Sequence, residues 1–176
     1  TLPEVNEETP SFVEFITGEG GVIDTWLRRG AAGFRLDVAD ELPDDFIEKI
    51  RAAVKRVSPE KFLLGEVWED ATTKYGFGQR RTYLLGKGLD SVMNYPFKNA
   101  VLDFVKGKPA EQAMGEILSI CEHYPAPAMD TALNFLSTHD TERALTVIAD
   151  EPANGRGREW QSGRCVTGEA YEEGML

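Results

Sequence analysis

The sequence predicts an α/β fold in which parallel strands alternate with helices. Runs of apolar residues with strand character alternate with segments of helical periodicity along most of the chain. The predicted strands are rich in Leu, Phe and Val and show little polar alternation, which is typical of strands that are covered on both faces. Repeated strand–helix–strand units of this kind build a parallel sheet with helical crossovers.

The helices are predicted from capping signals and from apolar spacing. Ser11 and Glu14 have the spacing of a capping box at the first helix. Pro43 is a favourable residue at the start of the longest one, which has acids in its first turn. Cys121 falls at an apolar position of the last one, where we expect a buried, reduced thiol. The predicted helices cover residues 11–16, 22–29, 43–57 and 113–121.

Four strands are predicted, over residues 32–38, 61–67, 89–95 and 132–137. They are compatible with an open doubly wound sheet or with a (β/α)8 barrel. No Gly-rich phosphate loop follows any of them, which weakens the doubly wound alternative. Polar residues gather instead where each strand ends, as they do at the mouth of a barrel. We therefore predict a partial (β/α)8 barrel, with about four of eight strands and their flanking helices in residues 1–176.

The charge and the hydropathy of the chain argue against several classes of partner. The 176 residues hold 30 acidic and 19 basic side chains, a net charge of −11. Binding to nucleic acid is not expected, because phosphate neutralisation needs a basic surface. A membrane partner is not expected either, since no apolar stretch is long enough to span a bilayer. No targeting segment is visible, and we expect a cytoplasmic location.

Three carboxylates stand at the ends of three predicted strands. They are Asp37, Glu66 and Asp140. Because the carboxyl ends of barrel strands converge on one mouth, where barrel enzymes place their chemistry, we expect these groups to share one site.

Arg35 gives two of these carboxylates different expected roles. It precedes Asp37 by two residues, so the two side chains share a face of the strand, and the cation favours an ionised Asp37. The apolar residues on both sides of Glu66 favour a protonated acid there. An ionised Asp beside a protonated Glu is the division of labour of retaining glycoside hydrolysis.

Residues 33–41, 65–70 and 135–140 resemble three conserved regions of the α-amylase family of retaining glycoside hydrolases. The resemblance implies that Asp37 is the nucleophile, Glu66 the general acid/base and Asp140 the stabiliser of the transition state. The segment from Val38 to Glu41 is similar to the Val-Ala-Asn-Glu sequence of the neopullulanase, cyclomaltodextrinase and maltogenic amylase branch. Asp40 departs from that pattern, because the branch has Asn there.

The activity that the resemblance implies is double displacement on α-glucosidic bonds of starch-like glucans, α-1,4 or α-1,6. Arg35 and His139 match residues that contact the sugar. Trp68 either stacks on a glucose ring or packs in the core. No cofactor is implied, and calcium in the whole protein stays open, since no residue of this chain commits to an ion.

Two other classes of protein compete with this interpretation. A metal-dependent lyase or isomerase barrel also places Asp, Glu and Asp at strand ends, as Mg²⁺ ligands. Arg35 argues against it, because a guanidinium there repels a cation. A scaffold that binds a glucan or a protein partner without catalysis is the second alternative. It is expected to lack at least one of the three carboxylates, and this chain has all of them.

The resemblance extends from before the fourth strand of the family's barrel to the helix after its seventh. We therefore expect residues 1–176 to be an internal fragment of a catalytic domain. A half barrel has two edge strands with unpaired backbone groups, so we expect self-association. We also expect the isolated chain to have little hydrolytic activity, since walls of the substrate site are missing.

Overall fold

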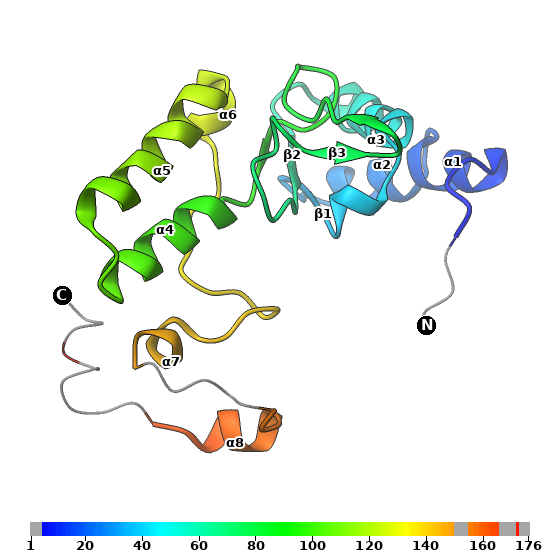
Figure 1. The fold of residues 1–176 in the computed structure, drawn as a ribbon. Helices are drawn as coiled ribbons and strands as arrows, with labels where there is room; N and C mark the ends of the chain where they lie inside the picture. The colour runs from blue at the N-terminus through cyan, green and yellow to red at the C-terminus, as the bar shows by residue number, and fades with distance from the viewer. Residues whose placement is uncertain (1–4, 150–154, 166–171, 173–176) are drawn as a thin grey trace. The chain divides into compact units, whose positions relative to one another are not determined.

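The computed structural model describes residues 5–149, 155–165 and 172 (Figure 1). The chain divides into two compact units, which are taken one at a time. The first contains the residues up to Asn94 together with Cys121–Leu133. The second contains Tyr95–Ile120 and the residues from Asn134 onwards.

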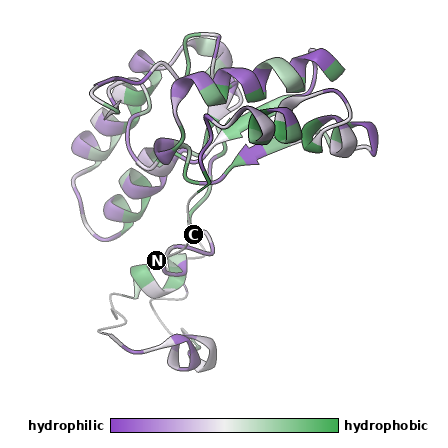
Figure 2. Ribbon diagram, turned by 90° about the vertical axis from the view of Figure 1, so that its right-hand side faces the viewer, coloured by the Kyte–Doolittle hydropathy of each residue, from purple (hydrophilic) through white to green (hydrophobic). Residues whose placement is uncertain are grey.

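A parallel sheet forms the centre of the first unit. Its strands are β1 (Gly33–Leu36), β2 (Phe62–Gly65) and β5 (Ser91–Val92), in the order β1-β2-β5. β1 and β2 approach closely at Gly33, where a Cβ atom would lie 2.0 Å from the carbonyl oxygen of Phe62. The strands are mostly green in Figure 2, in keeping with their apolar sequences. The predicted parallel arrangement is therefore confirmed for these three strands.

The fourth predicted strand, over residues 132–137, is wrong. Only Leu133 pairs with the sheet, through a parallel bridge to Met93. Its N–H donates to Val92 and its carbonyl accepts from the N–H of Asn94. The ladder ends at that residue, because the chain then passes into the second unit.

The third predicted strand, over residues 89–95, is too long. It is confined to β5, and α4 (Tyr95–Val105) begins soon after it. Pro96 lies at the second residue of α4, where its fixed φ angle suits a helix and its missing N–H costs nothing.

Three helices form one layer of the first unit (Figure 1). They are α1 (Pro10–Thr17), α2 (Val22–Arg28) and α3 (Asp44–Val57). In this layer α3 packs against β2, while α1 and α2 pack against α3 and each other. The predicted capping box is wrong, because α1 begins one residue before Ser11 and its N-cap is Thr9, which makes no side-chain cap. α3 has the predicted form, with two acids in its first turn and a buried apolar stripe of Phe46, Ile47, Ile50, Ala53 and Val54.

Two aspartates, the buried Asp24 and the half-buried Asp90, connect these helices to one another and to the sheet. Asp24 of α2 accepts a hydrogen bond of 2.7 Å from Arg56 of α3, and this bond holds the pKa of Asp24 below its usual value. Asp90 lies between Lys55, 2.8 Å away, and Arg51, 2.6 Å away, both from α3. It also accepts the N–H of Leu63 in β2. Asp90 therefore connects α3 to the sheet.

The loop after β2 contains a short antiparallel hairpin, β3 (Tyr75–Gly76) and β4 (Gln79–Arg80). A 3-10 turn, η1 (Ala39–Glu41), follows β1. The short helix α6 (Ala126–Asp130) completes the first unit, and its Ala128 carbonyl accepts a hydrogen bond from Ser91 of β5.

The second unit is built around α4 and most of α5 (Ala110–His123), with α7 (Ala144–Ile148) and α8 (Arg158–Gly163) further along the chain. Apolar residues of α4 and α5 line one shared hollow: Ala100, Val101, Phe104, Ala110, Ala113, Met114 and Ile117. Among the described residues, no helix is both long and apolar enough to cross a bilayer.

The expectation of a buried Cys121 is wrong, since this residue is exposed. The buried positions of α5 are Ala113 and Ile120. Each helical residue is turned by about 100° from the one before it, so the residue after Ile120 points away from the buried side.

We predict that Asp90→Asn lowers the free energy of unfolding by about 2–3 kcal/mol at pH 7, because two partly buried cations lose their counter-ion. Burial alone would raise the pKa of Asp90, but the hydrogen bonds from Lys55 and Arg51 outweigh it and leave this pKa below its ordinary value. The carboxylate of Asp90 therefore stabilises the fold at pH values above the ordinary aspartate pKa of about 3.9. This stabilisation is lost as the pH falls below that value.

Urea denaturation at pH 7 and at pH 3 measures this effect. The difference between the wild type and the variant is expected to narrow at the lower pH. Asp130→Asn, at an exposed position of α6, is the control and should leave the stability unchanged. A loss of equal size in both variants contradicts the role of Asp90.

Candidate active site

Two carboxylates at the ends of neighbouring strands share one guanidinium. Asp37 follows β1 and is 75% exposed, whereas Glu66 follows β2 and is 4% exposed. Arg35 of β1 bonds to Asp37 through one terminal nitrogen, and its other terminal nitrogen lies 3.1 Å from Oε2 of Glu66. The structure therefore brings an exposed and a buried carboxylate together at the carboxyl edge of the sheet, with one cation between them.

The surroundings of Glu66 differ from the apolar ones expected. Its Oε2 accepts the backbone N–H of Val38 at 2.8 Å, and its Oε1 accepts the indole N–H of Trp68 at 3.0 Å. The residues near it in the sequence, Leu64 and Val67, are themselves buried. The sequence predicts that Arg35 lies beside Asp37, because the two residues are close on the same strand. It does not predict the contact of Arg35 with Glu66, because that contact depends on which residues of β1 and β2 lie side by side.

Val38 holds an unusual backbone conformation next to Asp37. Its φ of 42° and ψ of 54° lie in the left-handed region, which β-branched residues rarely adopt. Such strain costs of order 1–3 kcal/mol and is typically found at functional sites. In this conformation the N–H of Val38 donates to Glu66. The turn directly after Asp37 therefore also holds the carboxylate of Glu66.

Trp68 lies beside Glu66 and is 46% exposed, which removes the core-packing alternative for its ring. Its indole nitrogen fixes one oxygen of Glu66. The exposed part of the ring remains open to a ligand.

The second unit holds the other two predicted site residues. His139 and Asp140 are adjacent, and Nε2 of His139 lies 3.1 Å from Oδ2 of Asp140. The N–H of Asp140 donates to the hydroxyl of Thr138, so a turn presents the pair. Both side chains are exposed, His139 the more so.

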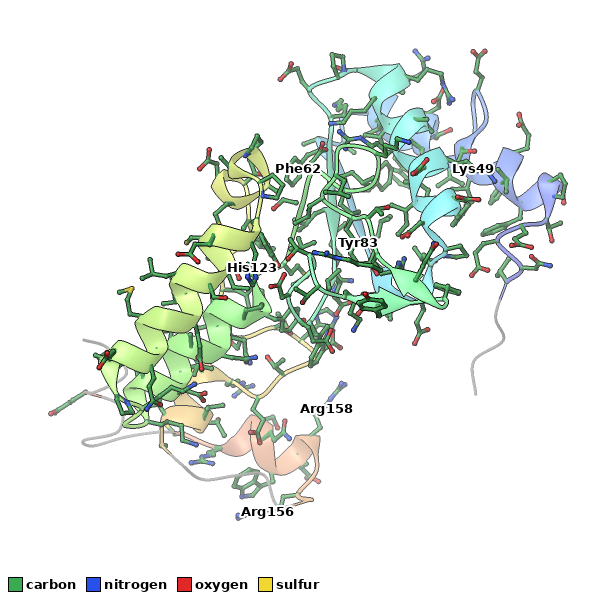
Figure 3. The ribbon with its side chains drawn as sticks, turned by 45° about the horizontal axis from the view of Figure 1, so that its top comes forward. Lys49, Phe62, Tyr83, His123, Arg156 and Arg158 are labelled. Carbon is green, nitrogen blue, oxygen red and sulfur yellow. The ribbon has the colours of Figure 1, made fainter. Side chains whose placement is uncertain are left out.

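Asp40 is bound by two residues that the sequence analysis did not single out. Its carboxylate accepts the hydroxyl of Tyr83 at 2.8 Å and lies 2.9 Å from Nζ of Lys74. Burial and the bond to Asp40 raise the pKa of Tyr83 well above its usual value. Tyr83 is labelled in Figure 3. A carboxylate offers more acceptor capacity than the amide expected at this position, which suits a hydroxyl and an ammonium together.

Arg81 also connects the loop after β2 to the segment after β1. Its buried guanidinium donates to Asp44 at 2.8 Å and to the carbonyls of Asp40 and Leu42. The Gly-Phe-Gly stretch of residues 76–78 indicates a turn in the sequence, but it does not indicate which segment the residues after that turn contact.

A cleft of about 540 Å³ opens beside Asp37. Half of its lining residues are acidic, namely Glu7, Asp37, Asp40 and Glu41, and the others are Val38, Leu42, Pro43 and Phe77. Carboxylates accept hydrogen bonds and carry negative charge, so the cleft suits a neutral ligand with many hydroxyl donors. Among the described residues, no group of three or more His, Cys, Asp or Glu side chains could hold a metal ion.

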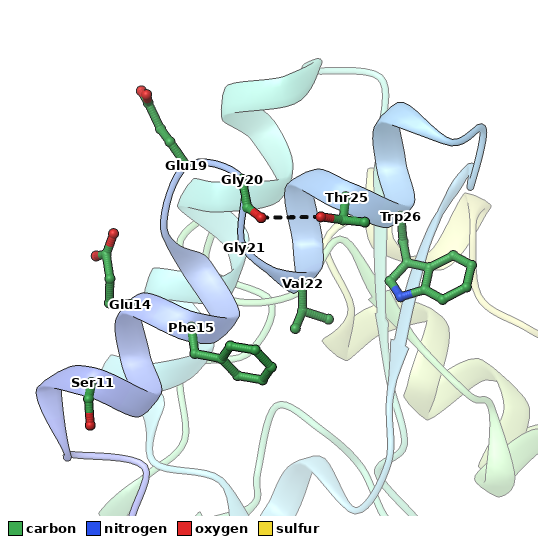
Figure 4. A pocket seen from close by; sticks show the side chains of 9 residues that line it. All are labelled: Ser11, Glu14, Phe15, Glu19, Gly20, Gly21, Val22, Thr25 and Trp26. Carbon is green, nitrogen blue, oxygen red and sulfur yellow. Dashed lines mark hydrogen bonds between the residues drawn. The ribbon is translucent and has the colours of Figure 1, made fainter.

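A second hollow, of about 560 Å³, lies at α1 and α2 (Figure 4). Its lining residues all come from these helices and their connection, where Thr25 donates a hydrogen bond of 3.2 Å to the carbonyl of Gly20. None of them belongs to a strand end. The hollow is therefore separate from the carboxylates that could perform chemistry.

Residues 1–162 match the family described as the catalytic domain of α-amylase. The chain belongs to the α-amylase family. It is 36% identical over 151 residues to a cyclomaltodextrinase of a Bacillus species, covering 82% of this chain and 24% of that protein. It is 33% identical over 157 residues to neopullulanase 2 of Thermoactinomyces vulgaris, covering 88% of this chain and 25% of that protein.

A solved structure of the α-amylase family has a similar fold. The cyclic α-maltosyl-(1→6)-maltose hydrolase of Arthrobacter globiformis superposes with a TM-score of 0.74 at 28% identity, covering 85% of this chain and 32% of that one. The predicted family and partial (β/α)8 barrel are thus confirmed, and this is a family of glycosidases. The chain spans about a quarter of the length of the curated relatives named above.

We predict that Tyr83→Phe lowers the free energy of unfolding by about 1–2 kcal/mol, because the buried hydroxyl loses its bond to Asp40 while the ring keeps its packing. Thermal or urea unfolding measures the change. Tyr75→Phe, at a position that is 71% exposed, is the matched control and should be neutral. Equal stability of Tyr83→Phe and the wild type would show that this bond does not hold the loop.

Proposed function

We propose that the whole protein is a retaining glycoside hydrolase that cleaves α-glucosidic bonds by double displacement. The observation that carries the proposal is the arrangement around Arg35. It places an exposed carboxylate, Asp37, and a buried one, Glu66, at adjacent strand ends with a cation in contact with both. Retaining glycosidases use a pair of carboxylates of this kind, one as nucleophile and one as acid/base.

In the first step, an oxygen of Asp37 attacks the anomeric carbon of the bound sugar. The bond from that carbon to the leaving oxygen breaks, and Glu66 gives its proton to that oxygen. Arg35 holds Asp37 in place through Oδ1, which leaves the other carboxylate oxygen for the attack. The products are a glycosyl ester on Asp37 and an ionised Glu66.

In the second step, Glu66 takes a proton from water, and the water oxygen attacks the anomeric carbon. The ester bond breaks and returns Asp37 as a carboxylate, so the configuration of the sugar is retained. The N–H groups of Val38 and Trp68 orient Glu66 for both proton transfers. Arg35 faces one ionised carboxylate at each stage, first Asp37 and then Glu66.

His139 and Asp140 complete the proposed machinery. We assign them to hydroxyl groups of the reacting sugar, and Asp140 to the charge that develops in the transition state, because they lie in residues 135–140, the last of the three segments that resemble the family. Both side chains are exposed and can be reached by a ligand, and they lie 3.1 Å from each other. Contacts that tighten as the sugar ring flattens accelerate the reaction.

The substrates that fit best are α-glucans. The similar proteins are named for cyclomaltodextrin, pullulan and a cyclic maltosyl-maltose. We therefore infer α-1,4 or α-1,6 glucosidic bonds as the targets. A magnesium-dependent reaction is disfavoured, because the guanidinium of Arg35 occupies the place between Asp37 and Glu66 that a shared cation would need.

Residues 1–176 on their own are proposed to hydrolyse little glucan and to self-associate. Barrel active sites are built from the loops of eight strands, whereas the described residues form three parallel strands and one bridge. Within the described part of the chain, β1 pairs with β2 on one side only, and Phe15 and Trp26 nearby are exposed. Edge strands and apolar surface of this kind favour association.

Light scattering of this chain at increasing concentration tests the association. A mass that rises above that of one chain is expected, and a monomer at every concentration contradicts it.

We predict that Asp37→Asn lowers kcat of the whole protein on cyclomaltodextrin or pullulan by at least about a thousandfold, since an amide oxygen is a poor nucleophile. Reducing-sugar release measures it. Glu60→Gln changes an exposed acid outside the cleft and should keep kcat within about threefold of the wild type. Normal turnover by Asp37→Asn removes this residue from the nucleophile role.

We predict that the loss of kcat/KM caused by Glu66→Gln depends on the leaving group of the substrate. For a natural glucan, kcat/KM should fall about 10²–10⁴-fold, because the leaving oxygen needs a proton. For an α-glucosyl fluoride, whose leaving group needs none, kcat/KM should fall far less. Equal losses on both substrates contradict the acid role of Glu66.

A further inference from the structure

The hairpin after β2 carries a large aromatic residue at its tip. β3 and β4 are joined by Phe77 and Gly78, whose φ angles are 51° and 76°. Two central residues with positive φ form a type I′ turn, whose first position favours Asn, Asp or Gly. Phenylalanine is strained there. Local folding preference therefore does not explain the residue.

Core packing does not explain it either. The side chain of Phe77 is 62% exposed. Its described ring contact is with the guanidinium of Arg81, whose central carbon lies 5.2 Å from the ring centre. Arg81 is itself buried and fixed by its bonds to Asp44 and Leu42, so it is a rigid support for the ring. A strained, exposed and yet firmly supported ring is suited to bind a ligand.

The ring faces the cleft that Asp37 borders. Phe77 and Asp37 line the same volume of about 540 Å³, and its other lining residues are three carboxylates and the apolar residues Val38, Leu42 and Pro43. A pyranose ring matches this combination, because its C–H face packs on an aromatic ring while its hydroxyls donate to carboxylates at its edge. An anionic ligand does not match it.

We propose that Phe77 is a substrate-binding residue that stacks on a glucose unit of an α-glucan chain in this cleft. The proposal rests on the glycoside hydrolase function proposed above and adds a subsite to it. Phe77 belongs to the hairpin and not to the strand ends that carry Asp37 and Glu66, so we assign the stacked unit to the neighbour of the sugar under attack. The contact therefore acts on long substrates and not on short ones.

Two substitutions in the whole protein distinguish the effect of the aromatic ring from the effect of the hairpin conformation. Phe77→Asn removes the ring and suits the first position of a type I′ turn, so the hairpin should stay intact or become more stable. Phe77→Tyr keeps the ring and is the matched control. Thermal unfolding of both variants checks that the fold is retained.

For maltoheptaose, we expect Phe77→Asn to raise KM about three- to tenfold while kcat stays within about twofold, which is the size of effect that one aromatic contact gives. For α-glucosyl fluoride, both constants should stay at the wild-type values. Phe77→Tyr should match the wild type on both substrates. Unchanged kinetics of Phe77→Asn on maltoheptaose, or equal changes on both substrates, overturn the proposal.

Calorimetric titration with maltoheptaose keeps the two proposals distinguishable. A wild-type protein without turnover contradicts the hydrolase function, but it can still bind the oligosaccharide, and weaker binding by Phe77→Asn then supports the subsite alone. Equal binding by the wild type and Phe77→Asn overturns the subsite. A change in oligomeric mass of Phe77→Asn, with unchanged sugar binding, shows that the ring is a protein contact instead.

Discussion

The guanidinium of Arg35 is the contact on which the account of this chain depends. One terminal nitrogen binds Asp37 and the other lies 3.1 Å from Glu66. This reach is possible because β1 and β2 are parallel and in close contact, so that their carboxyl ends meet at one edge. In double displacement one of the two carboxylates is ionised at each stage, first Asp37 and then Glu66. A single fixed cation can therefore balance the charge throughout the proposed reaction.

Buried and half-buried polar contacts hold the loops around this pair. Asp40 binds Tyr83 and Lys74, and Arg81 ties the hairpin loop to the segment after β1. Burial lowers the pKa of Lys74, but its bonds to Glu69 and Asp40 outweigh that effect and raise it, so the ammonium stays charged. Ion pairs of this kind cost desolvation and contribute little net stability, but they fix one geometry. Loops fixed in this way position the cleft wall and the strained turn at Val38.

The sequence was sufficient for features that depend on local pattern. Parallel strands, the amphipathic helix α3, and the placement of Asp37 and Glu66 at strand ends all follow from periodicity and chain order. It was insufficient where tertiary contacts decide. The segment of residues 132–137 has strand composition, yet only Leu133 finds a partner in the sheet. The contact of Arg35 with Glu66 and the ties of Arg81 join segments far apart in the chain, and no local pattern encodes them.

Trapping the glycosyl ester is the most direct test of the central claim. The whole protein is incubated with an activated 2-deoxy-2-fluoro α-glucosyl substrate, which slows the second step, and its peptides are sequenced by mass spectrometry. One added sugar is expected, on the peptide that contains Asp37 and at that side chain. A sugar attached to a different carboxylate, or a product of inverted configuration with no ester formed, would contradict the account.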